Sequence, residues 1–573
     1  MNLGELLARF FGKMTNNQNS IKEEVNFKGF IKLLVAIYIV LGIVLLFNNQ
    51  LIFNIRLGLI NLLIPIVIAS LIHGILSRRK KYIITAIIIV LFYLILKVVS
   101  SPLIMWKAQR NLIGPVKEVK FSDQIQPIDL KQLPTINKEF AAKLADKKLG
   151  SIQGLGSQVT IGNLTLQSVK GQLYYVAPLE PSSFIKWFLN GGTSGYVMVS
   201  ATDQSKVELI TELNGKPLKL KYLQDAYWFK NIERYAYFKD MMAGHTDFSF
   251  ELNDSGEPYW VVTRYTAGVG IDGQRIIGTE VINAQTGETK VYSIKDTPKW
   301  IDRIQPEYTT INHLNKWGEL VHGPFNFSGK DKLKTTDGMN LIYNNNESYY
   351  YTGITSVGND EGLVGFTLTN TRTGQTTMYK TAGATETAAM KSAEGKVQQF
   401  KYTATFPYLI NIQNEPTYFM TLLDANGILK QYAMVNVKNY GIVAVGDSLK
   451  STLDSYIKEI NSTGMTIQGS DKNSIELTGK IQRIGLVVNN GESTYEMKLD
   501  SSDKIFSVAT QTSKDVALTN IGDEVRINYI NIGDNRYMLV NGFTNLTLNE
   551  LIEQKNMSSE IKPIEVEKQK EAA

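Results

Sequence analysis

The sequence predicts three transmembrane helices, then an α+β exterior, then a small carboxy-terminal β-barrel. Uncharged apolar runs of membrane-spanning length occur only near the amino terminus. The later sequence is rich in Asn, Thr and Gly, and the chain has 28 tyrosines, a composition that suits strands and turns. Strand-like segments there alternate with single helices, which favours antiparallel sheets, each covered by a helix.

The predicted transmembrane region is residues 29–106. The first span is 33–47, entered through 29–32, and the second is 57–76. The third is 82–96, with an extension that reaches Trp106. Each run is long enough to cross a bilayer.

A basic loop separates the second and third spans and is predicted to determine the topology. Cytoplasmic loops are enriched in Lys and Arg, so this loop, made of Arg78, Arg79, Lys80 and Lys81, is expected inside the cell. The amino-terminal segment 1–28, which contains a possible amphipathic helix, is then also cytoplasmic. We therefore expect a multi-pass cell-membrane protein with the bulk of its chain extracytoplasmic.

Charge and cysteine content exclude several function classes. The chain carries a net charge of +6, of which residues 1–81 contribute +7, so the other 492 residues sum to −1. The basic balance therefore reflects membrane topology, and no nucleic-acid partner is expected. The absence of cysteine excludes disulfides, thiolate metal sites and cysteine nucleophiles.

The first part of the exterior, 107–170, is predicted as a proline-broken extended tether, a helix at 138–149 and the first strands. Further strands are expected at 173–177 and 196–200. A helix at 222–242 carries an aromatic stripe, which is typical of a core-facing surface.

An internal repeat is the most informative feature outside the membrane. Residues 283–292 and 370–379 share Asn, Thr-Gly, Thr and Tyr at identical offsets. Each copy is predicted to be a hairpin whose turn needs positive φ, at Gly287 and at Gly374. A related phrase opens other units at 257 and 415, with a weaker third copy at 173. Further helices are expected at 298–304, 310–320, 385–399 and 448–460. These patterns divide the exterior into modules at 171–295 and 296–460.

Part of the repeat resembles a known module. The phrase Pro416-x-Tyr418-Phe-Met-x-Leu-x-Asp424-x-x-Gly427, followed by Tyr432-Ala-Met-Val and a helix, is similar to the PepSY module of extracytoplasmic bacterial proteins. Residues 258–294 are similar in a looser way. As a whole, residues 138–460 resemble large membrane-anchored proteins of Gram-positive bacteria and their mobile elements. The resemblance implies an envelope location and, through PepSY, the regulation of an extracytoplasmic peptidase.

The last domain follows a Gly/Ser/Asn-rich linker at 461–473. Five predicted strands in 474–547 resemble an OB-type barrel. The domain has seven Lys/Arg and nine Asp/Glu, a net charge of −2, which disfavours nucleic-acid binding. The tail, 548–573, is charged and poor in apolar residues.

No catalytic, cofactor-binding or metal site is predicted. Gly268-Val-Gly270-Ile-Asp-Gly273 matches the dinucleotide pattern, but a strand follows it where that motif needs a helix, so a hairpin is expected. His245, His313 and His322 stand apart and suggest structural roles, with His313 on the exposed or edge side of its helix.

Three functions remain open from the sequence. The leading hypothesis is a non-catalytic membrane-anchored protein whose exterior binds or scaffolds another envelope or membrane protein. The first alternative is a regulator or inhibitor of an extracytoplasmic peptidase. The second is a cell-wall hydrolase, which needs paired carboxylates in a cleft. The expected partners are the lipid bilayer and an unidentified membrane or envelope protein.

Overall fold

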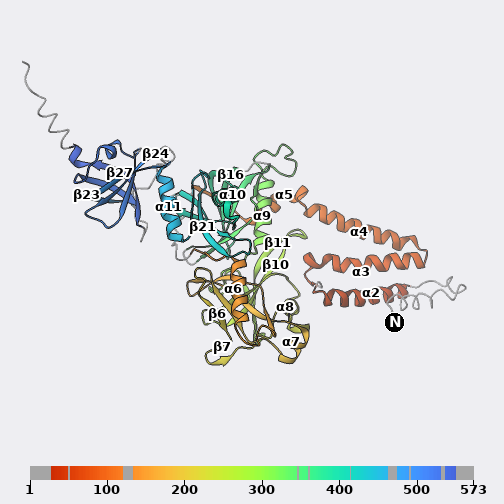
Figure 1. Ribbon diagram of the computed structural model, residues 1–573. Helices are drawn as coiled ribbons and strands as arrows, with labels where there is room; N and C mark the ends of the chain where they lie inside the picture. The colour runs from red at the N-terminus through yellow and green to blue at the C-terminus, as the bar shows by residue number, and fades with distance from the viewer. Residues whose placement is uncertain are drawn as a thin grey trace, which may run out of the picture.

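The computed structural model describes residues 27–49, 52–120, 133–344, 347–358, 362–412, 415–462, 474–489, 492–510, 512–530 and 536–549. Three long helices extend from one side of a β-rich exterior, and the barrel stands at the opposite end (Figure 1). The amphipathic segment before residue 27, most of the 461–473 linker and the tail after residue 549 lie outside the described residues.

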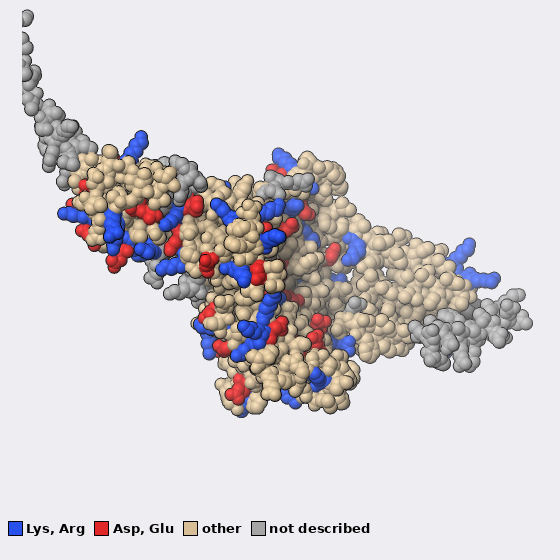
Figure 2. Space-filling view, viewed as in Figure 1, with Lys and Arg blue, Asp and Glu red and all other residues tan. Residues whose placement is uncertain are grey.

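Three helices are long and apolar enough to cross a membrane: α2 (Phe27–Phe47), α3 (Ile55–Leu76) and α4 (Lys80–Ser100). Much of their apolar surface is exposed, as a lipid-facing surface requires. Figure 2 shows this region as almost free of charge, with basic side chains at its far end.

The third helix contains the predicted span 82–96 but ends before the predicted extension reaches Trp106. It ends at Ser100, and the hydroxyl of Ser101 accepts a hydrogen bond from the backbone N–H of Leu103. This contact caps a separate helix, α5 (Pro102–Arg110), with proline at its first position. Trp106 therefore lies in α5 and is not part of a span.

The exterior repeats one structural unit four times. Each unit begins with a docking segment and a helix, followed by an antiparallel sheet whose main strands lie in chain order. The docking segment contains one docking residue, whose backbone N–H donates to a carbonyl just after the third main strand: Ile136, Tyr222, Gln305 or Ala384. The units are 133–210, 220–293, 301–383 and 384–446. Their helices are α6 (Lys138–Gly150), α8 (Ile232–Lys239), α9 (Glu307–Glu319) and α10 (Glu386–Lys396).

The four sheets have matching strands. Unit 1 contains β3 (Thr165–Val169), β4 (Gln172–Pro181), β5 (Tyr196–Ser200) and β6 (Val207–Ile210). Unit 2 contains β9 (Gly244–Leu252), β10 (Pro258–Val269), β11 (Asp272–Asn283) and β12 (Thr289–Ser293). Unit 3 contains β14 (Asn340–Asn344), β15 (Glu347–Ser356), β16 (Gly362–Asn370) and β17 (Thr376–Ala384). Unit 4 contains β19 (Tyr408–Ile412), β20 (Glu415–Leu423), β21 (Leu429–Asn436) and β22 (Val443–Gly446).

A short strand precedes the first main strand in three of the units and pairs with the far end of the second main strand. These strands are β2 (Val159–Ile161), β13 (Leu333–Thr335) and β18 (Thr403–Ala404). In unit 2 the single strand β9 pairs with β10 over this whole length, with one irregularity in its register. The repeat thus extends to strand pairing and is not limited to strand order.

The turn between the third and fourth main strands has the same hydrogen bonds in all four units. One side-chain oxygen accepts from the backbone N–H groups two and three residues later, at 2.9–3.2 Å. The residue that supplies it is Ser200, Asn283, Asn370 or Asn436. The sequence shows this repeat only where the asparagine is followed by Thr-Gly, as in units 2 and 3.

The two turns identified from sequence match closely. Gly287 and Gly374 have φ of 78° and 75°. In each turn the glycine N–H donates to the backbone carbonyl of the leading asparagine at 2.9 Å. Glycine adopts this left-handed conformation without the clash that a Cβ causes.

A buried aromatic residue on the second strand holds each docking segment. Trp260 Nε1 donates to the carbonyl of Tyr222 at 2.8 Å in unit 2. The hydroxyls of Tyr350 and Tyr418 donate to the equivalent carbonyls in units 3 and 4, at 3.0 and 3.1 Å. Tyr175 takes the same position in unit 1 and is 5% exposed. The same hydrogen bond, from an aromatic side chain to a docking-segment carbonyl, is therefore present in units 2, 3 and 4.

Two predicted helices differ from the structure. Residues 222–227 are not helical, because the N–H of Tyr222 is bound to the carbonyl of Ala284; only η4 (Trp228–Lys230) and α8 are helical there. Residues 298–304 are also not helical, because the guanidinium of Arg372 binds the carbonyls of Thr297, Pro298 and Ile301.

Part of the predicted tether is ordered sheet. Residues Val116–Lys120 form β1, which pairs in parallel with β17 of unit 3. The chain leaving the membrane therefore becomes the edge strand of a unit that lies more than two hundred residues later in the sequence. The register joins Val116 to Thr376 and Lys120 to Lys380.

The carboxy-terminal strands form a closed barrel in the order β23-β24-β25-β27-β26. The strands are β23 (Ser474–Asn489), β24 (Glu492–Leu499), β25 (Ile505–Ala509), β26 (Glu524–Ile530) and β27 (Tyr537–Asn545). Only the β25–β27 pair is parallel. The barrel has its own buried core and contacts α11 (Leu449–Ser462), where Lys458 Nζ lies 3.5 Å from Glu496 Oε1.

Candidate functional site

Several hydrogen bonds fix the exterior to the ends of the spans that adjoin it. The hydroxyl of Ser100, the last residue of α4, accepts from the N–H of Ile271 at 3.2 Å. The loop between α2 and α3 is held at two points: Phe53 donates its N–H to the carbonyl of Met241, and Arg234 donates to the carbonyl of Phe47, both at 2.9 Å.

The glycine-rich phrase that matches a dinucleotide motif forms the tip of the β10–β11 hairpin, as the sequence predicted. Its glycines permit a close approach to the membrane helices. A Cβ on Gly270 would lie 2.2 Å from the hydroxyl of Ser100, and one on Gly268 would lie 2.8 Å from Leu112. The requirement for glycine here is thus explained by packing against the end of α4.

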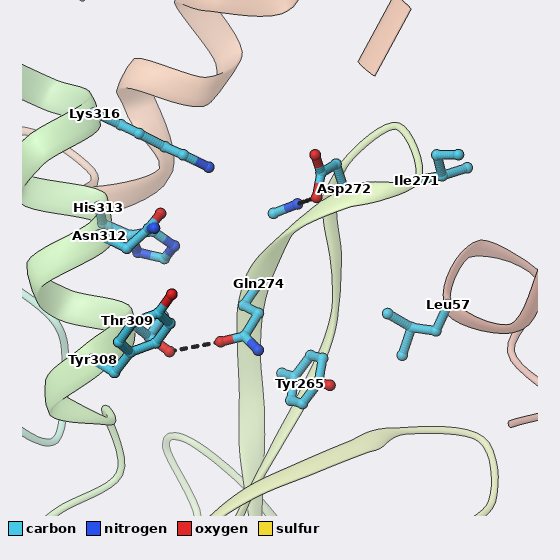
Figure 3. A pocket seen from close by; sticks show the side chains of 11 residues that line it. Leu57, Tyr265, Ile271, Asp272, Gln274, Tyr308, Thr309, Asn312, His313 and Lys316 are labelled. Carbon is cyan, nitrogen blue, oxygen red and sulfur yellow. Dashed lines mark hydrogen bonds between the residues drawn. The ribbon is translucent and has the colours of Figure 1, made fainter. Parts of the chain in front are cut away.

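A polar cavity of about 300 Å³ lies at this junction (Figure 3). The helix α9 forms one wall, the β10–β11 hairpin forms the opposite wall, and Leu57 of α3 closes one side. The α9 wall consists of Tyr308, Thr309, Asn312, His313 and Lys316. We call this space the juxtamembrane cleft.

Two further cavities adjoin the cleft. One, of about 420 Å³, lies along α9 beside Pro102 and shares Tyr308, Asn312 and Lys316 with the cleft. The other, of about 350 Å³, lies between the α2–α3 loop, α8 and β9 and shares Leu57 and Tyr265. The three cavities together follow the boundary between the spans and the exterior.

Hydrogen bonds fix the walls of the cleft. Thr309 donates to the side-chain oxygen of Gln274 across the cleft at 2.7 Å. Lys316 Nζ donates to Gln109 Oε1 at 2.8 Å, and Gln109 Nε2 donates to the carbonyl of Ser100 at 2.9 Å. A chain of contacts therefore runs from the end of α4 through a fully buried glutamine to α9.

The pKa values of two groups on the α9 wall, His313 and Lys316, are shifted so that the neutral forms are favoured. Burial, with a smaller effect from the charge of Lys316, lowers the pKa of His313 to about 4, although a hydrogen bond with the Gln274 backbone opposes the shift. Burial also lowers the pKa of Lys316, and the charge of Asp272 opposes this. His313 is consequently neutral at pH 7. It is only 8% exposed, which corrects the expectation that it lies on the exposed or edge side of its helix.

The cleft has the chemistry of a polar binding site. Its described lining contains amides, hydroxyls, a neutral imidazole and a lysine, with Asp272 as its only carboxylate. The adjoining cavities likewise contain one carboxylate each, Glu319 in one and Glu233 in the other. The paired carboxylates of glycoside hydrolysis are not present in these three linings.

The carboxylates whose pKa values are strongly raised lie elsewhere. Burial raises the pKa of Glu251 to about 8 and that of Glu180 to about 7. Glu180 accepts from the N–H groups of Gln224 and Asp225, both at 3.1 Å, which joins unit 1 to unit 2. Asp302 Oδ2 accepts from the N–H of Ser168 at 2.7 Å, which joins unit 3 to unit 1. These carboxylates do not line the three cavities.

The residues singled out from sequence are not brought together. Arg78, Arg79, Lys80 and Lys81 lie at the far end of the spans, where Arg78 has a φ of 51° between α3 and α4. Gly287 and Gly374 are in turns of different units. The cleft was missed because its walls come from α3, a hairpin and α9, and no local sequence pattern joins them. Among the described residues there is also no group of three His, Cys, Asp or Glu that could hold a metal ion.

Comparison with known proteins identifies no family for this chain. No protein-family model matches it, and no curated protein does. Among solved structures, an ACO/RPE65 chimera matches at 9% identity with a TM-score of 0.14, over 51% of each chain, so the match spans about half of that protein. A β-fructofuranosidase from Bombyx mori matches at 9% identity and a TM-score of 0.16, over 71% of this chain and 70% of that one. A mutant levansucrase of B. megaterium matches at 10% identity and a TM-score of 0.16, over 75% of this chain and 96% of that one. These scores carry no functional argument.

Proposed function

We propose that this chain is a non-catalytic, membrane-anchored protein whose extracytoplasmic part binds another membrane or envelope protein in the juxtamembrane cleft. The basic loop between α3 and α4 supports an orientation in which the amino terminus is cytoplasmic and the units and barrel are outside. The protein is then a multi-pass protein of the cell membrane.

The observation that carries this proposal is the rigid junction between spans and exterior. The cleft lies where a partner's chain emerges from the bilayer, and contacts among α4, α5 and α9 fix its walls. Its amides and hydroxyls offer hydrogen bonds to an exposed polypeptide backbone. A site that is preformed in this way loses little conformational entropy on binding.

Single-cysteine crosslinking tests the proposal, because the native chain has no cysteine. We expect full-length Asn312→Cys, carrying a photoactivatable crosslinker, to give a discrete adduct with a membrane or envelope protein in native membranes. The matched control is Tyr440→Cys, which is 56% exposed and lines none of the three cavities. Absence of an adduct from position 312, or the same adducts from both positions, would refute the proposal.

The peptidase alternative makes a different prediction for the same experiment. The PepSY-like resemblance of 416–435, together with the helix that precedes each sheet, favours a module that contacts a peptidase. An adduct that contains an extracytoplasmic peptidase, with altered proteolysis in a deletion strain, would establish that reading.

The carboxy-terminal barrel is proposed to be OB-like and to contribute protein-binding surface. Five strands with one parallel pair support the assignment, and the net charge of −2 opposes nucleic-acid binding. Its separate core suggests that residues 472–548 fold alone. Titration of this fragment with a single-stranded oligonucleotide should show no binding at physiological salt, and salt-sensitive micromolar binding would contradict the protein-binding role.

A further inference from the structure

The four units differ most where segments have been added to the common pattern. In unit 1 the helix α7 (Phe184–Asn190) lies between β4 and β5, where unit 2 has only a tight hairpin. In unit 2 residues 223–231 separate the docking residue from α8, whereas one residue separates the docking residue from the helix in the other units. These segments are not needed to build the unit, since the other copies form without them.

The added segments, together with α8 and the residues that follow it, carry large apolar side chains at the surface. More than half of the surface of each of six residues is exposed: Ile185, Phe188, Leu189, Trp228, Phe229 and Met242. We call these six residues, with the partly exposed Phe184 and Phe238, the aromatic patch. The rings of Phe184 and Trp228 lie 5.8 Å apart and those of Phe229 and Phe238 lie 5.4 Å apart, so the two segments form one surface.

This surface corrects an expectation from the sequence. The stripe at 222–242 was predicted to face the core, yet Trp228 is 57% exposed and Phe229 is 64% exposed. Monomeric proteins rarely expose contiguous apolar surface of this kind without using it for binding. The patch therefore requires an apolar occupant.

The patch adjoins the outer ends of the spans. Arg234 of α8 and Met241 bind the backbone of Phe47 and Phe53, which flank the α2–α3 loop. Phe53 is itself 59% exposed, so apolar surface extends from the spans toward Met242. Figure 1 shows α7 and α8 on the side of the exterior that faces the membrane helices.

A second apolar element lies beside α5, the helix that follows the third span. The connection between α9 and β13 is the longest helix-to-strand connection of the four units, and it carries Phe325 and Phe327, which are 68% and 89% exposed. A Cβ on Gly323 in this connection would lie 3.4 Å from the ring of Trp106 in α5.

We propose that the aromatic patch lies in the headgroup layer of the outer leaflet, so that the exterior rests on the membrane beside its own spans. Continuity with the lipid-facing surface of the spans identifies lipid as the occupant. Trp, Phe and Leu with nearby lysines are the composition of interfacial segments, and Lys186, Lys230 and Lys239 lie within or next to the patch.

The test uses the full-length chain in vesicles of phosphatidylcholine and phosphatidylglycerol. A fraction of the lipids carries a fluorescence quencher on the headgroup. An environment-sensitive fluorophore is attached to Phe188→Cys, to Phe229→Cys, or to the control Leu518→Cys. Leu518 is 65% exposed on the barrel, at the end of the molecule away from the spans (Figure 1). We expect the lipid quencher to act on the first two labels at least about twofold more strongly than on the control, since interfacial side chains lie at headgroup depth.

Two results would overturn the proposal. The first is equal quenching of the Phe188→Cys, Phe229→Cys and Leu518→Cys labels, which would place the patch in water. The second is protection of the patch labels in native membranes only, without quenching in lipid vesicles, which would assign the patch to a protein partner. The two patch variants lie in different added segments, so a folding defect in one leaves the other as a test.

Discussion

Removal of one hydroxyl from the buried anchor of unit 4, by Tyr418→Phe, should weaken the whole exterior. Tyr418 is fully buried and donates to the carbonyl of Ala384 at 3.1 Å. Phenylalanine fills nearly the same volume, so the cost comes from a buried carbonyl that loses its donor, about 1–3 kcal/mol. For a unit of about 60 residues each kcal/mol lowers Tm by about 4–8 °C, so the expected fall is about 4 °C or more.

Thermal unfolding of the full-length chain in detergent, followed by near-ultraviolet circular dichroism, measures this effect. Tyr350→Phe should act in the same direction but less strongly, because its equivalent hydrogen bond to Gln305 is only partly buried. Tyr440→Phe is the matched control at a position that is 56% exposed, and it should leave Tm unchanged. An unchanged Tm for Tyr418→Phe, or an equal fall for Tyr440→Phe, would refute the anchoring role.

Three further predictions follow from the described geometry. Gly287→Val and Gly374→Val should each destabilise the folded chain by about 1 kcal/mol or more, because both glycines have positive φ. Gly287→Val should cost more, because a Cβ there would lie 2.4 Å from a tyrosine ring, whereas the nearest atom at Gly374 is 3.5 Å away. Equal falls in Tm would contradict this steric argument. Burial raises the pKa of Glu251 to about 8 from 4.5, so the folded chain holds a proton that the unfolded chain loses. The contribution of this group to stability should therefore be greatest below pH 4.5 and decline up to pH 8 by at most about 1.4 kcal/mol per pH unit. Glu251→Gln should flatten the fall of Tm with pH, and an unaltered fall would show that other groups cause it. A reporter active only outside the cell should be active at Ala573 and silent within 77–81, and the opposite pattern would reverse the proposed orientation.

The membrane region and most element positions are readable from the sequence because they depend on local physical rules. A run of apolar residues such as 57–76 is unstable in water whatever its surroundings, and it lies in the second long helix, Ile55–Leu76, as expected. The helix 138–149 has an acidic first turn and basic last turn, and it is observed at Lys138–Gly150. The barrel strands also lie close to their predicted positions.

The repeat shows where local reasoning stops. Units 2 and 3 share Thr-Gly after the turn asparagine, so their kinship is visible in the sequence. Unit 1 places Ser200 in the equivalent role, and unit 4 has Asn436 without a following Thr-Gly. Different residues supply the same acceptor oxygen, so only the hydrogen bonds reveal that the four turns are one structure.

What the sequence by itself determined is a three-span anchor, an α+β exterior and the turn chemistry of two repeated hairpins, since each depends on residues that are neighbours in the chain. The tertiary structure alone decided the bounds and shared strand pairing of the four units, the juxtamembrane cleft and the exposure of the aromatic patch. Each of these depends on contacts between distant segments, such as Lys316 with Gln109 and Arg234 with Phe47. The prediction for the stripe at 222–242 was therefore wrong. Periodicity shows that one face is apolar, whereas the packing of the whole chain decides whether that face is buried in the protein or exposed at its surface.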